Sequence, residues 1–230
     1  MPKLWCLIIF SFTTIVDAFP QTKSISLFNG KDLSGWHSDV PELDKNKTIP
    51  NPFLVRNKRL VSLGSPGGHL ITDQQYQNFK LEFKYRFVGK PGNCGVLFFV
   101  STPRALYDMF PKSIEVQMMH ENAGDFWCIE ENIEVPNMEA RRGPKEKWGV
   151  NGDKLRRIPN LTDGTEKPLG QWNYYQIECV GNSIKVWLNG VLVNYGYNCT
   201  ASVGQIALQS EGAEVEFENI NLLPITQLSN

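Results

Sequence analysis

The sequence has few of the residues that build a metal-binding or nucleic-acid-binding protein. It contains three histidines, and no two of its five cysteines have the C-x-x-C spacing of a structural zinc site. Its formal net charge is −1, which argues against nucleic acid or an anionic membrane as a partner. It lacks internal repeats, and after its first residues no apolar run is long enough to span a bilayer. We therefore expect no nucleic-acid partner and no membrane span.

The longest apolar run lies at the N-terminus. Lys3 precedes an apolar stretch over residues 4–16, and residues 16–18, ending in Ala18, have the small-residue character of a cleavage site. This order is typical of a secretory signal. We expect a signal peptide over residues 1–18 and a periplasmic or secreted mature protein.

Cleavage of the signal would leave four cysteines. In an oxidising compartment an even number permits two disulfides, in any of three pairings that the sequence does not choose between. Buried free thiols are the other interpretation. The four residues are Cys94, Cys128, Cys179 and Cys199.

Alternating apolar and polar residues predict strands along most of the chain. The clearest case is residues 78–87, where Phe79 and every second residue after it are apolar or aromatic and the residues between are charged. Asn189-Gly190, between two such runs, is a strong hairpin signal. No helical period is present, and about ten short strands predict an all-β, two-sheet sandwich or jelly roll. The expected strands are 25–28, 57–63, 78–87, 95–100, 113–120, 172–180, 183–188, 191–195, 204–209 and 213–222.

Residues 121–171 interrupt this pattern. They are rich in glycine, proline, asparagine and charge, but Trp127 and Trp148 argue against simple disorder. We interpret them as a long irregular loop folded over one face of a single jelly-roll domain spanning residues 24–226.

A strand over residues 113–120 carries the first candidate site residues. Ile114, Val116 and Met118 would face the core, while Glu115 and Gln117 would share the opposite face. This polar row resembles the floor of a sugar-binding groove, and an ordinary solvated face is the alternative. Gln209 and Glu211 share a face in the same way, and tryptophans could stack on a pyranose ring. The candidates are Glu115, Gln117, Gln209 and Glu211, with Trp127 and Trp172 as platforms; for each the alternative is a solvated surface or a hydrogen bond at the core edge.

Ordinary glycoside hydrolysis needs two carboxylates about 5–9 Å apart. On the strand containing Glu115, the residue at that distance is Gln117, which can neither attack nor take a proton. A second carboxylate would have to come from Glu211, Glu130 or Glu131, and the sequence alone does not favour this.

Six segments, in order, resemble one known family. They are SLFNGKDLSGW (26–36), NFKLEFKYRF (78–87), NCGVLFF (93–99), IEVQM (114–118), WNYYQIECVGNSIKVWLNG (172–190) and GQIALQSEGAEVEFENINLLP (204–224). Together they are similar to the 3-keto-disaccharide hydrolases, also described as 3-keto-glucoside 1,2-lyases and 3-keto-2-hydroxyglucal hydratases. The resemblance implies a concanavalin A-like jelly roll of the lectin and glucanase type, export, and action on glucosides oxidised at C3.

The chemistry that this resemblance implies suits a site with few carboxylates. A ketone at C3 acidifies the C2 proton, so one base can start β-elimination of the C1 oxygen. Glu115 is the candidate base, and His120 is a candidate acid, base or metal ligand. The cofactor stays open, with a divalent metal as one candidate. The substrate would contact Gln117, Trp127, Gln209 and Glu211, with Gln117 or Gln209 orienting its hydroxyls.

The chain also departs from the family pattern. Phe99 stands where many relatives have arginine, Cys94 where they have serine, and Glu211 where they often have histidine. The leading hypothesis is an exported enzyme that cleaves the glycosidic bond of 3-keto-glucosides or disaccharides. A non-catalytic, lectin-like carbohydrate-binding module is the alternative, and a scaffold domain without a ligand is the third.

Overall fold

The chain forms strands that belong to two antiparallel sheets, and the computed structural model describes residues 23–230. The predicted signal peptide therefore lies outside the described residues. Sheet A contains β1 (Ile25–Ser26), β3 (Phe53–Arg56), β4 (Arg59–Ser62), β6 (Phe79–Phe87), β11 (Asn173–Val180), β12 (Ser183–Leu188), β13 (Val191–Gly196) and β15 (Val215–Pro224). Sheet B contains β2 (Trp36–Asp39), β5 (Gly68–Thr72), β7 (Gly95–Val100), β8 (Ser113–Gln117), β9 (Phe126–Ile129), β10 (Arg157–Ile158) and β14 (Gln205–Ser210).

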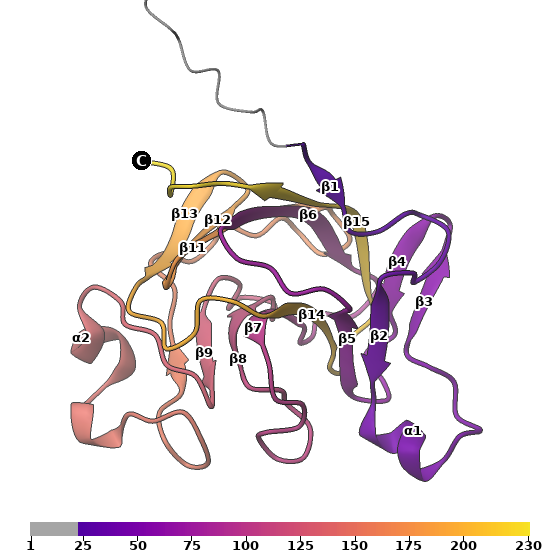
Figure 1. Cartoon of the computed structure of the whole chain (residues 1–230), viewed down its shortest axis with the longest axis horizontal. Helices are drawn as coiled ribbons and strands as arrows, with labels where there is room; N and C mark the ends of the chain where they lie inside the picture. Colours follow the sequence, from indigo (N-terminus) through magenta and orange to yellow (C-terminus); the bar gives the residue numbers. More distant parts are fainter. Residues whose placement is uncertain (1–22) are drawn as a thin grey trace, which may run out of the picture.

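The two sheets lie face to face, as the upper and lower layers of Figure 1 show. The strand order is β13-β12-β11-β6-β15-β4-β3 in sheet A, with β1 paired to β15, and β10-β9-β8-β7-β14-β5-β2 in sheet B. The predicted all-β, two-sheet jelly roll is confirmed. Because most neighbours are not consecutive in sequence, residues far apart along the chain meet on each sheet face.

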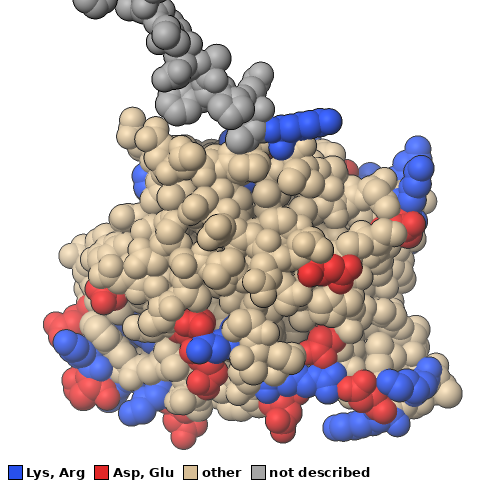
Figure 2. Space-filling model, in the orientation of Figure 1, with Lys and Arg blue, Asp and Glu red and all other residues tan. Residues whose placement is uncertain are grey.

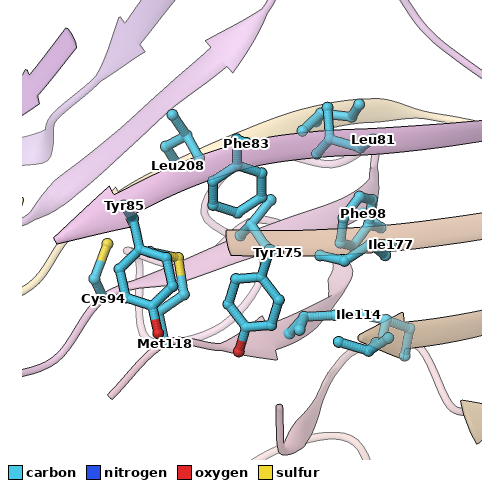
Figure 3. Packing of buried hydrophobic residues seen from close by; sticks show 14 of the residues in the cluster. Leu81, Phe83, Tyr85, Cys94, Phe98, Ile114, Met118, Tyr175, Ile177 and Leu208 are labelled. Carbon is cyan, nitrogen blue, oxygen red and sulfur yellow. The ribbon is translucent and has the colours of Figure 1, made fainter. Parts of the chain in front are cut away.

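Alternation in sequence produces the core between the sheets. In β6 every odd-numbered residue from Phe79 to Phe87 is buried and the residues between are half-buried. Tyr85 of β6 stacks on Tyr175 of β11 with ring centroids 5.4 Å apart. Figure 3 shows that these rings belong to the same buried cluster as Phe98 and Ile114 of sheet B. Burying apolar area at about 25 cal/mol per Å² is the main stabilising contribution of such a core.

Sheet B is buried on both faces at its centre. All residues of β7 and β8 are buried, although β8 alternates polar and apolar residues. The reason is the loop over residues 101–112, which places Leu106 in a second apolar cluster with Ile71, Leu97 and Ala207. Glu115 and Gln117 therefore do not lie on a solvated face, and only 5% and 4% of their surfaces are exposed.

The segment 121–171 is more ordered than the sequence predicts. It contributes β9 and β10 to the edge of sheet B, and it contains α2 (Met138–Arg142) and one 3-10 turn, η1 (Lys145–Lys147). These elements are too short to give a period in the sequence. They are fixed instead by side chains such as Arg142, which donates to the backbone carbonyls of Leu155 and Gly149. A further short helix, α1 (Pro41–Lys45), follows β2.

All four cysteines of the described residues are buried free thiols rather than disulfides. No described helix has the length and apolarity needed to cross a membrane. Figure 2 shows side chains of both charges interspersed along the lower margin of the molecule, where α1 and α2 lie in Figure 1.

Candidate functional site

The strand order of sheet B gathers polar side chains from four strands, β5, β8, β9 and β14, on its outer face. Glu115 of β8 lies opposite Trp127 of β9 and opposite Leu97 of β7. On the other side of β7, Gln209 of β14 lies opposite His69 of β5. Because Leu97 belongs to the outer apolar cluster, its neighbour Glu115 shares that outer face.

Gly95 of β7 makes room for these side chains. A Cβ atom on Gly95 would lie 2.3 Å from Glu115 Oε1 and 2.8 Å from Gln209 Oε1. Such distances are far below van der Waals contact, so no other residue fits without displacing both groups. The two side chains therefore converge over a residue that has none.

The convergent groups line a cavity of about 150 Å³, which we call the polar cavity. A second cavity of about 290 Å³, the apolar cavity, adjoins it, and both are lined by Phe110 and Glu211. The polar cavity is lined by Asn93, Phe110, Glu115, Gln117, Trp127, Ile129, Arg156 and Glu211. The apolar cavity is lined by Gly67, Gly68, His69, Met109, Phe110, Gln209, Ser210 and Glu211.

Buried polar atoms without a hydrogen-bond partner concentrate around these cavities. Within the described part of the chain they include Glu115 Oε1, Trp127 Nε1, Asn93 Oδ1, both amide atoms of Gln209 and both ring nitrogens of His69. Folded proteins pair the great majority of their buried polar groups, since each unpaired group costs about 1–3 kcal/mol. A cluster of unpaired groups next to a cavity indicates a site whose partners come from a ligand.

The two carboxyl groups of the site hold their protons more tightly than usual. Burial and, to a smaller extent, the neighbouring Glu211 carboxyl raise the pKa of Glu115 to about 8, while Gln209 and Arg156 act in the opposite direction. Burial also raises the pKa of Glu211, which the nearby Asn93 amide partly offsets. Buried carboxyls with raised pKa values inside a cavity are typical of acid–base sites.

The other side chains of the polar cavity are held in place by the protein. The side-chain oxygen Oε1 of Gln117 accepts hydrogen bonds of 3.0 Å from the backbone N–H groups of Met118 and Met119. The Arg156 guanidinium lies 5.1 Å from the centre of the Trp127 ring, close enough for a cation–π contact. This contact places one positive charge beside the two carboxyls.

The structure thus brings together five of the predicted site residues and separates a sixth. Glu115, Gln117, Trp127 and Glu211 line the polar cavity, and Gln209 lines the adjoining one. His120 instead lines a separate, open pocket of about 830 Å³ after β8, with its Nδ1 3.5 Å from Glu166.

Trp172, the other predicted platform, lies over sheet A. The guanidinium groups of Arg59 and Arg86 lie 5.3 and 4.7 Å from its ring centre. Its ring therefore contacts two arginines and not the polar cavity.

Four residues of the two cavities escape sequence reasoning. His69 sits in an apolar strand, Asn93 precedes a strand, and Phe110 and Arg156 lie in irregular segments without a periodic pattern. For Phe110 and Arg156 the sequence offers one indication, since aromatic and basic residues in long loops often belong to binding sites. For His69 and Asn93 it offers none.

Within residues 23–230, no three His, Cys, Asp or Glu side chains are grouped so that they could hold a metal ion. Glu115 and Glu211 offer two carboxylates, and His120 does not join them. We therefore derive no step through a metal.

The fold and the site define a two-sheet jelly roll with a buried polar cavity on one sheet. Solved structures of this architecture include a putative glycosyl hydrolase from Parabacteroides distasonis, 20% identical with a TM-score of 0.62, covering 88% of this chain and 94% of that one. Others are the carbohydrate-binding module CBM66 from Bacillus subtilis (13% identity, 82% and 95% coverage, TM-score 0.52) and a β-glucanase from Bacillus licheniformis (13%, 90% and 98%, 0.51).

The chain belongs to the family of 3-keto-alpha-glucoside-1,2-lyase-like domains, whose model matches residues 23–223. This match confirms the family predicted from the six sequence segments and supports a carbohydrate-active function. Among curated protein sequences, no match was found.

Proposed function

We propose that this protein cleaves the glycosidic bond of glucosides oxidised at C3, by elimination of the C1 substituent and hydration of the product. The observation that carries the proposal is a pair of carboxyls, the buried Glu115 and the half-buried Glu211, in a cavity with unpaired polar atoms. Family membership supports the same chemistry.

In the proposed first step, ionised Glu115 removes the C2 proton of the 3-keto ring. The electron pair of the broken C2–H bond forms the C1–C2 double bond, and the C1–O bond breaks. Protonated Glu211, at the junction of the two cavities, gives its proton to the departing oxygen. The Arg156 guanidinium and the site amides stabilise the charge that develops on the C3 oxygen.

In the proposed second step, water adds across the C1–C2 double bond. Glu211, now ionised, takes a proton from the water as its oxygen bonds to C1, and Glu115 returns its proton to C2. The products are 3-keto-glucose and the free alcohol. Both carboxyls recover their starting protonation states.

The carboxyl pair favours an enzyme over a lectin-like module. A module that only binds sugar needs aromatic rings and ordinary polar groups. It has no use for a deeply buried carboxyl whose pKa is raised to about 8. Such a group lowers the stability of the fold when it ionises, and it is a stronger base than a solvated carboxylate.

The test is NMR of the protein with 3-keto-trehalose and with trehalose, with and without added divalent cations, from pH 5 to 9. We expect glucose release or a glucal signal from the keto sugar alone. The value of kcat/KM should pass through a maximum with pH, because Glu115 must lose its proton to act as the base while Glu211 must keep its own to act as the acid. Line broadening without turnover would instead assign the protein to the binding modules.

We propose further that the protein is exported, to the periplasm or the medium, by a signal peptide over residues 1–18. N-terminal sequencing of the protein recovered from its native cells tests this. A first residue following Ala18 is the expected result, and recovery of the chain starting at Met1 would refute export by this signal.

A further inference from the structure

We propose that the apolar cavity receives the leaving group of the substrate and that it selects an aromatic aglycone over a second sugar. This inference rests on the proposed function, because it assumes that the 3-keto ring occupies the polar cavity. Glu211 lines both cavities, so a glycosidic oxygen beside Glu211 would direct its two substituents into the two cavities.

The size and the walls of the apolar cavity suit an aromatic ring. Its volume is about 290 Å³, and an apolar cavity of about 150 Å³ already holds benzene. Gly67 and Gly68 contribute backbone only, while Met109 and Phe110 contribute a thioether and a ring. Aromatic edges and methionine sulfur both make favourable contacts with a second ring.

The wall formed by Met109 and Phe110 is held in place by backbone hydrogen bonds. Leu106 and Phe110 exchange backbone hydrogen bonds of 2.9 and 3.0 Å, and the Met109 N–H donates to the Leu106 carbonyl at 3.1 Å. The Leu106 side chain is buried in the cluster on sheet B. The cavity is therefore preformed, which reduces the ordering cost of binding.

The polar groups that the apolar cavity can offer a second sugar are few, because the Gln209 amide converges with Glu115 over Gly95 and the Glu211 carboxyl is assigned to the glycosidic oxygen. The Ser210 hydroxyl already donates to the Pro66 carbonyl. His69 is 1% exposed, and burial lowers its pKa to about 4, so its ring is neutral and offers one donor and one acceptor. A glucosyl group would bring several hydroxyls, most of which would stay unpaired, whereas a phenolic ring brings one or two.

The experiment compares phenyl 3-keto-glucoside with methyl 3-keto-glucoside on the whole protein and on Met109→Gln. The variant keeps the length of the side chain but makes the cavity wall polar. We expect kcat/KM for the phenyl substrate to fall by about tenfold and that for the methyl substrate to stay unchanged. Since phenolate leaves more readily than methoxide, the change in the ratio on substitution is the informative quantity.

Met119→Gln is the matched control, because Met119 is 42% exposed and lines neither cavity. It should leave both rates unchanged. Equal rate losses for the two substrates in Met109→Gln, or no loss in either, would overturn the aromatic compartment while leaving the proposed function intact.

A second measurement covers the case in which no 3-keto-glucoside is cleaved. The methyl carbons of the five methionines are labelled, and phenyl glucoside or cellobiose is added. A shift of the Met109 signal with phenyl glucoside alone supports the compartment even if the proposed function fails. An unchanged Met109 signal, or an equal shift with cellobiose, refutes it.

Discussion

Replacing Glu115 by glutamine should abolish turnover and, above pH 5, make the protein more stable. Glutamine is nearly isosteric with glutamic acid and cannot ionise, so it keeps the packing over Gly95 without the buried charge. It can neither remove nor return a proton. A gain in stability with a loss of activity is the expected pattern at a site whose residues were selected for chemistry.

The size of the gain follows from the pKa of Glu115, which burial raises from 4.5 to about 8. Between these two pH values the unfolded chain has lost the proton and the folded protein keeps it. The folded state therefore loses about 1.4 kcal/mol of stability per pH unit through this group. The contribution of protonated Glu115 to the free energy of unfolding is fully present below pH 4.5 and is lost as the pH rises towards 8. By pH 7 the loss is about 3 kcal/mol, an upper bound because water in the cavity reduces it.

The assay is urea unfolding of the natural protein and Glu115→Gln at pH 5, 6, 7 and 8. The free energy of unfolding of the variant minus that of the natural protein should increase steadily over this range, while other titrating groups cancel in the difference. Glu146→Gln, at an exposed position, is the control and should give a flat difference. A flat difference for Glu115→Gln as well would refute the reasoning.

Three further substitutions test the site and the core. Gly95→Ala should lower kcat/KM strongly, because the added Cβ would displace Glu115 and Gln209. An unchanged kcat/KM would contradict this. His120→Ala should keep most of the activity, since His120 pairs with Glu166 away from the polar cavity; a complete loss in the same assay would restore it as a catalytic candidate. Tyr85→Phe should leave stability unchanged or raise it by about 1 kcal/mol in urea, because the buried Tyr85 hydroxyl has no partner in residues 23–230.

The strands that the sequence predicted well are those whose burial alternates. Residues 78–87 and 183–188 have one face on the core and one towards solvent, so the period of two appears directly in the residue types. Strands β2, β3 and β9 have only four residues each, too few to show a period. Strand β5 is buried throughout, so it lacks alternation altogether.

The sequence predicted which site residues of one strand share a sheet face. It did not predict which residues of different strands lie next to one another on that face. Glu115 and Gln117 share a face because they are two residues apart. That this face also carries Gln209 depends on β7 lying between β8 and β14, a neighbourhood set by tertiary packing. The strand predicted to reach His120 ends at Gln117, although the backbone N–H groups of Met118 and His120 still donate to the carbonyls of Cys94 and Gly92.

The polar atoms that define the site also predict how a ligand should act on the whole molecule. Glu115 Oε1, the Gln209 amide and the His69 ring nitrogens are buried without hydrogen-bond partners, at a cost that folding must offset. Apolar residues at these positions would extend the cluster around Leu97 and stabilise sheet B. A ligand that supplies the missing partners binds only the folded state, so it should raise the free energy of unfolding by about 2.7 kcal/mol at a hundredfold excess over its Kd. The same excess should stabilise Gly95→Ala much less, because that substitution disturbs the binding groups themselves.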